Sequence, residues 1–135
     1  MAARALAAPG PVRLALYADA AFELIVAVLL AVWASTWADL FNVDEAIIWL
    51  AALVFLMAAL GVGLIAVLQV EVRELVYSLA GANIAGGVVL WAFFAILRDD
   101  FDPGAQWAIA AVADSFILIG LLEILALRRS PTRDE

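Results

Sequence analysis

The chain has 135 residues, of which 68% are hydrophobic, and it carries a formal net charge of −7. Soluble domains hold about 45–50% apolar residues. A soluble fold of this length could not bury the apolar surface that 68% hydrophobic residues and a mean hydropathy of +1.10 imply. The acidic charge argues against nucleic-acid binding. The lack of Cys and His removes the usual ligands of haem, zinc and copper, and also the usual thiol and imidazole catalysts. We therefore expect no cofactor, no metal site and no enzymatic activity.

Four apolar stretches follow in chain order, at about residues 14–36, 46–69, 75–97 and 105–127. Each is long enough to cross a bilayer, since about 20 residues at 1.5 Å per residue span a hydrocarbon core of ~30 Å. Short connections favour neighbouring antiparallel helices. The sequence therefore predicts one membrane domain over residues 1–135, an all-α integral membrane four-helix bundle of up-down-up-down topology, with short flexible termini at 1–12 and 130–135.

Basic residues are concentrated on one side of the predicted bundle. Six arginines lie on that side, and Arg98 alone lies on the other. The six are Arg4, Arg13, Arg73, Arg128, Arg129 and Arg133. This bias predicts that both termini are cytoplasmic. The use of Arg without Lys and the many Ala residues favour a bacterial source, and so the bacterial inner membrane. A cleaved signal peptide is an alternative for the first span, but that run is too long and holds two carboxylates.

The loops on the side of Arg98 are acidic, and two of their acids precede predicted helices. Asp44 can cap the second span. Asp102 can cap the fourth, with Pro103 at the first helical position. These loops can also be interpreted as a cation-attracting vestibule, although solvated loops and helix caps explain them more simply.

Small residues indicate where the helices pack, because close backbone approach must supply attraction between helices in lipid. Ala59 and Gly63 are four apart in the second span, and Ala82 and Gly86 are four apart in the third. We interpret both pairs as helix-packing faces. The same pairs could mediate homodimerisation.

A shift of 60 residues aligns the two halves of the chain. It places Arg13 on Arg73, Tyr17 on Tyr77 and Glu23 on Asn83. If this alignment reflects a duplication, each half is a helical hairpin and the halves are related by an axis along the membrane normal, as in some transporters.

Acidic residues inside the first and fourth spans are the main indication of chemistry, and none of the four spans contains Arg or Lys. Counting along the helices places Glu23, Asn83 and Asp114 in one central layer and Asp19 and Glu123 in a second layer nearer the cytoplasm. Asp19 and Glu23 share a helix face, whereas Asp114 and Glu123, nine residues apart, point in opposite directions.

Three interpretations compete. One central acid costs a transmembrane helix about 2.5–3.5 kcal/mol, so the two acids of the first span must face protein or water. The carboxyls can be neutral and bonded to Asn83, Ser78, Ser115 or other internal groups, with Asp19 and Glu123 extending toward the interface. They can pair with a basic residue of a transmembrane partner subunit, which would make the chain an accessory or scaffold subunit. They can also bind protons or a cationic substrate.

These interpretations lead us to expect a small polytopic membrane protein with a structural or binding role; the alternative is a small proton- or cation-coupled transporter using Glu23 and Asp114. The residues that we expect to bind a proton, a cation or a partner are Glu23, Asp114, Asn83 and Asp19. Glu23 is the one we expect to be most sensitive. The expected partners are the lipid bilayer and either a transmembrane subunit or a second copy.

In layout the chain resembles the small multidrug resistance transporters, which have four short spans and a membrane-embedded glutamate in the first, here Glu23. This resemblance implies a dimer that exchanges protons for organic cations. The chain departs from that family in its additional acids Asp19 and Asp114, and in lacking a convincing motif around Glu23.

Overall fold

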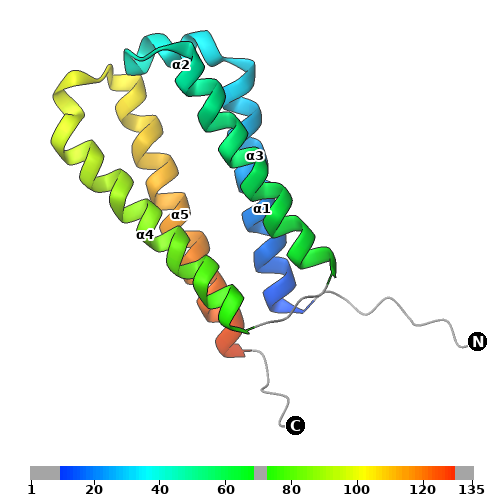
Figure 1. Ribbon diagram of the computed structural model, residues 1–135. Coiled ribbons are helices and arrows are strands. Elements are labelled where there is room, and N and C mark those ends of the chain that lie inside the picture. The colour runs from blue at the N-terminus through cyan, green and yellow to red at the C-terminus, as the bar shows by residue number, and fades with distance from the viewer. Residues whose placement is uncertain (1–9, 69–72, 130–135) are drawn as a thin grey trace, which may run out of the picture.

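A computed structural model describes residues 10–68 and 73–129 of the chain (Figure 1). The termini predicted to be flexible, 1–12 and 130–135, lie almost wholly outside these residues. Arg4 and Arg133, two of the six arginines from which the orientation was predicted, also lie outside the described residues.

The described residues form helices throughout, joined by short turns. In chain order these are α1 (Pro11–Val32), α2 (Ala34–Phe41), α3 (Glu45–Leu68), α4 (Arg73–Leu97), the 3-10 turn η1 (Arg98–Asp100) and α5 (Pro103–Arg129). The four long helices are long and apolar enough to cross a membrane. The predicted all-α fold with four membrane-spanning helices is thus confirmed, and the chain is a small polytopic membrane protein.

The first span is shorter than predicted. α1 ends at Val32, and Trp33 breaks the helix with φ −116° and ψ 36°. The break is stabilised by Trp37 of α2, whose indole Nε1 donates a hydrogen bond to the carbonyl of Leu29 at 3.0 Å. α2 then ends at Asn42, in the left-handed conformation that Asn tolerates better than most residues.

Both predicted caps are present. The Asp44 carboxylate accepts a hydrogen bond from the N–H of Ala46 at 2.8 Å, and the Asp102 carboxylate accepts one from the N–H of Gly104 at 2.8 Å. Pro103 is the first residue of α5. These side chains satisfy N–H groups that have no partner within a helix.

The long helices form two antiparallel hairpins, α1 with α3 and α4 with α5, and α1 packs against α5. Among the described residues, α3 and α4 make no extended contact of this kind. Figure 1 shows the start of α1, the end of α3, the start of α4 and the end of α5 at one end of the bundle. We call this the basic end, after Arg13, Arg73, Arg128 and Arg129, and the opposite one the acidic end.

An apolar core closes the basic end. Its buried side chains come from all four long helices and are Val12, Leu16, Val62, Ala66, Val76, Ala126 and Leu127. At the acidic end a smaller core of Ala34, Ala38 and Ile48 fixes α2 against α3.

Glycines bring α4 and α5 into close contact. A Cβ at Gly120 would lie 2.6 Å from the carbonyl oxygen of Ala80, and a Cβ at Gly87 would lie 2.6 Å from that of Ala113. Neither position can therefore hold a larger residue without moving a helix backbone. Gly87 is next to Gly86, one member of the packing pair predicted for this helix.

The two predicted packing pairs have different outcomes. Ala59 is buried, and a Cβ at Gly63 would lie 3.7 Å from that of Ala20, so this pair lies in the contact between α3 and α1. Ala82 is exposed, and a Cβ at Gly86 would meet nothing within 4 Å. The second pair therefore does not pack against the described residues, because it lies on a different face of α4 from Gly87.

The proposed duplication is only partly reflected in the fold. The Arg13 guanidinium lies 6.0 Å from the centre of the Tyr17 ring, and that of Arg73 lies 5.8 Å from the centre of the Tyr77 ring. The contact between α1 and α5, however, has no counterpart between α4 and α3. The arrangement of the two hairpins is therefore not the one that an axis relating the halves would produce.

Candidate functional site

Four polar side chains are buried between the hairpins. They are Asp19 and Glu23 of α1, Asn83 of α4 and Glu123 of α5, and we call them the carboxyl cluster. Their exposed fractions are 1%, 5%, 7% and 0%, respectively. In a chain with so many exposed apolar side chains, this burial sets the cluster apart from the lipid-facing surface.

The Asn83 amide connects the cluster across three helices. Its Nδ2 donates hydrogen bonds to Oδ2 of Asp19 at 3.0 Å and to Oε2 of Glu123 at 3.2 Å. The Asp19 and Glu123 carboxyls therefore lie close to each other, on either side of one amide nitrogen. Glu23 interacts electrostatically with both.

Local helix geometry explains how these residues meet. Asp19 and Glu23 are four residues apart and therefore share the face of α1 that packs in the bundle. Asn83 lies on the buried face of α4 with Val76, Ala80 and Gly87. Because Gly120 has no side chain, α4 approaches α5 closely, and a Cβ there would lie 3.3 Å from that of Asn83. This close approach places the amide within reach of Glu123.

Part of the cluster has no hydrogen-bond partner. The buried atoms Oδ1 of Asp19, Oε2 of Glu23 and Oε1 of Glu123 accept no hydrogen bond from any described residue. Several carboxylates cannot share one buried site in ionised form without a compensating charge. The cluster therefore holds protons, a cation or both.

No basic side chain of the described residues neutralises the cluster. Arg13 donates from Nε to the carbonyl of Ala66 at the basic end, at 3.2 Å, and Arg98 pairs with Asp99 at the acidic end, at 3.5 Å. Within residues 10–68 and 73–129, no group of three acidic side chains has the arrangement of a metal site.

Apolar side chains surround the cluster. Toward the basic end lies the core formed by all four long helices. At about the depth of Glu23, the Phe22 ring meets the Phe116 ring at 5.5 Å, and the Phe55 ring stacks on Phe116 at 5.8 Å. These rings come from α1, α5 and α3, so aromatic contacts join three helices beside the cluster.

Asp114, expected in the central layer, is not part of the cluster. It lies on the exposed face of α5, where its Oδ1 accepts a hydrogen bond from the indole Nε1 of Trp91 at 2.9 Å. The expectation that Asp114 and Glu123 point in opposite directions is confirmed, since Glu123 is fully buried. Asp114 is near the middle of α5, as its depth predicted, but it does not join Glu23 and Asn83, because depth along a helix says nothing about direction around it.

Asp19 and Glu123 also differ from expectation. They were expected to extend toward the interface, but they are the two most deeply buried members of the cluster and bond to Asn83. Of the expected partners, Asn83 is used, whereas Ser78 and Ser115 donate to carbonyls of their own helices at 2.8 and 2.7 Å.

Glu123 is the member of the cluster that sequence reasoning left out of the expected site. A signal for it was present in the small residues Gly120 and Ala126, three positions to either side. Small residues on both flanks of a polar residue indicate a helix-contact face. The sequence argument used only the depth of Glu123 along its span, which placed it in the layer nearer the cytoplasm.

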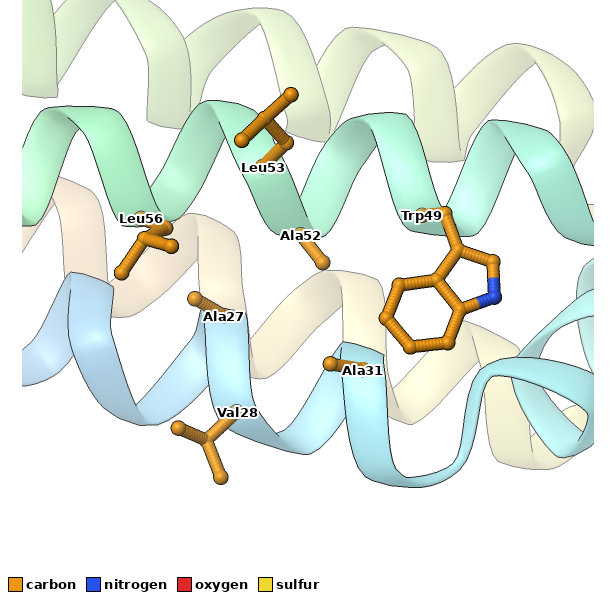
Figure 2. A pocket seen from close by; sticks show the side chains of 7 residues that line it. All are labelled: Ala27, Val28, Ala31, Trp49, Ala52, Leu53 and Leu56. Atoms are coloured by element: carbon orange, nitrogen blue, oxygen red, sulfur yellow. The ribbon is translucent and has the colours of Figure 1, made fainter.

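A separate apolar pocket of about 240 Å³ lies between α1 and α3. Figure 2 shows its lining residues, which are Ala27, Val28, Ala31, Trp49, Ala52, Leu53 and Leu56. The Trp49 indole belongs to this lining, and its Nε1 is bonded to Glu45 at 3.0 Å. No member of the carboxyl cluster lines this pocket, so it does not contribute to the site.

Comparison of the chain with models of known protein families gave no match, and searches of curated proteins and of solved structures gave none either. The functional argument therefore rests on the geometry of the carboxyl cluster.

Proposed function

We propose that this chain is a small proton-coupled cation transporter of the bacterial inner membrane, without enzymatic activity, and that the carboxyl cluster binds protons and a cationic substrate in alternation. In this proposal the basic end faces the cytoplasm, as the distribution of arginines predicts. The observation that carries it is the convergence of Asp19 and Glu123 on the buried Asn83 amide, with Glu23 buried one helical turn from Asp19 and no basic side chain bonded to the cluster among the described residues.

The energetics of the cluster support binding that alternates. When the carboxyls hold protons, they are neutral and compatible with a dry site. When protons leave, the remaining negative charge needs a cation to compensate it. Protons and a cation therefore compete for the same three carboxyl groups, and this competition is the basis of exchange.

Two groups of apolar side chains next to the cluster supply candidate gates. They are the basic-end core and the rings of Phe22, Phe55 and Phe116, which lie at about the depth of Glu23. Exchange across the membrane requires that one of these groups opens at a time. Because α3 and α4 make no extended contact among the described residues, movement of one hairpin relative to the other would mainly change the contact between α1 and α5.

Two other interpretations give different expectations. A purely structural cluster would keep its protons when cations are added.

The other interpretation is pairing with a basic residue of a partner subunit. It is not supported for Asp19, Glu23 or Glu123, because none of them is more than 5% exposed. A residue on another helix outside the bundle could not reach them.

The test is proton release from the purified protein in weakly buffered detergent solution, followed with a pH-sensitive dye. Sodium, potassium and tetramethylammonium would be added in turn. We expect at least one of them to release protons from the wild-type protein and from Asp114→Asn, but much less from Glu23→Gln and Glu123→Gln. The same cation should drive proton movement in proteoliposomes.

Either of two results would contradict the proposal. One is that none of the cations releases protons from a folded wild-type protein, which would favour a structural cluster. The other is that Glu23→Gln and Glu123→Gln release protons as the wild type does, which would place the binding site elsewhere.

A further inference from the structure

Asp114 has an unusual position for an acidic residue. It lies on the exposed face of α5, 11 residues after Pro103 and 15 before Arg129, which is about 16 Å and 22 Å along the helix axis at 1.5 Å per residue. The carboxyl is therefore near the middle of a membrane-spanning helix. Ionisable residues at this depth normally face protein or water, because lipid solvates them poorly.

Its hydrogen bond leaves half of the carboxyl free. Trp91 of α4 donates from Nε1 to Oδ1 at 2.9 Å, which holds the group in a defined orientation. Among the described residues, Oδ2 has no hydrogen-bond partner. The surrounding exposed side chains of α5 are apolar and include Trp107, Leu118, Leu121 and Leu125. This face therefore combines an apolar surface with one unneutralised acid.

Charge decides which occupant fits this face. The basic residues of the described part of the chain lie at the ends of the bundle, as Arg13, Arg73, Arg98, Arg128 and Arg129 show. A second copy packed in parallel through this face would place Asp114 against Asp114 and add like charge. A helix with a basic residue at the same depth supplies the missing charge and covers the apolar surface.

We propose that the face of α5 around Asp114 binds a transmembrane helix of a different protein, which carries Lys or Arg near its middle and pairs with the free Oδ2. The pairing is independent of the carboxyl cluster, because Asp114 lies on the opposite side of α5 from Glu123. The chain can thus be a subunit of a larger membrane complex whether or not it transports cations.

The test uses two synthetic transmembrane peptides of leucine and alanine that differ only at the central residue, which is lysine or leucine. The protein has no native cysteine, so Asp99→Cys at the acidic end can carry a single fluorophore. Energy transfer to labelled peptide in lipid vesicles then measures association. We expect the lysine peptide to bind the wild type about tenfold more tightly than the leucine peptide.

Matched variants assign the preference to the proposed contact. Asp114→Asn should abolish the preference for lysine, Asp114→Glu should retain it, and Trp91→Phe should weaken it. Glu23→Gln should leave it unchanged, because Glu23 faces the interior. Thermal unfolding of each variant confirms that it is folded.

Three results would overturn the proposal. The two peptides could bind the wild type equally, or the preference for lysine could persist in Asp114→Asn. Energy transfer between differently labelled copies of the chain, lost in Asp114→Asn, would instead show that a second copy occupies the face.

Discussion

The Nδ2 of Asn83 lies 3.0 Å from Oδ2 of Asp19, and this hydrogen bond joins residues 64 positions apart in the chain. It connects α4 of one hairpin to α1 of the other, although these helices make no extended contact. The same nitrogen also donates to Glu123 at 3.2 Å. A single amide thereby links the two hairpins, which also pack through α1 and α5.

Asn83→Leu should destabilise the protein by about 1–3 kcal/mol, because the buried carboxyls of Asp19 and Glu123 lose their shared donor. We expect a lower midpoint of thermal unfolding in mild detergent, followed by tryptophan fluorescence. Ser78→Ala is the control on the same helix, since Ser78 bonds only the carbonyl of Glu74. An unchanged midpoint for Asn83→Leu would show that the amide contributes little.

Gly120→Ala should destabilise the contact between α4 and α5, because the new Cβ would lie 2.6 Å from the carbonyl oxygen of Ala80. Separating the backbones enough to admit a methyl group should cost about 1–3 kcal/mol. It should also weaken the hydrogen bond from Asn83 to Glu123. The thermal midpoint measures the first effect.

Gly81→Ala is the matched control, because a Cβ at Gly81 would meet nothing within 4 Å. Alanine there should be neutral or slightly stabilising, since it favours a helix over glycine by up to about 1 kcal/mol. Equal effects of Gly120→Ala and Gly81→Ala would contradict the packing described for Gly120.

The double variant Asp19→Leu/Glu123→Leu should be poorly expressed and unstable. It leaves the buried Asn83 amide without acceptors, at a cost of about 1–3 kcal/mol, and adds volume to a closed site. The sequence suggested instead that both residues lie near the membrane interface, where leucine would be tolerated. The control is Asp114→Leu on the exposed face of α5, which should keep the wild-type yield and thermal midpoint in the isolated protein. A normal yield of the double variant would argue against the burial of Asp19 and Glu123.

Cysteine labelling tests the orientation, because the chain has no native cysteine. In intact bacterial cells, Asp99→Cys at the acidic end should react with a membrane-impermeant maleimide. Glu74→Cys at the basic end should react only after the membrane is permeabilised. The reverse pattern would place the basic end outside and contradict the positive-inside argument.

The four membrane-spanning helices were predictable because the signal for them is local. A run of about 20 apolar residues must be helical in lipid, since no water is available to satisfy its backbone groups. The caps at Asp44 and Asp102 act over two residues and were equally readable. The break at Trp33 was missed because it depends on α2 and on the bond from Trp37 to Leu29.

The sequence by itself determined the number of spans, their antiparallel order and the presence of acids without internal bases. Only the tertiary structure decided which acids meet, because this depends on how each helix is rotated about its axis and on which helices touch. Gly87 and Gly120 set the approach of α4 to α5. That approach brings Asn83 to Glu123, and the packing of α1 against α5 brings Asp19 to the same amide. Asp114, on the opposite side of α5, is left on the outer surface, which no count of depth along the chain could show.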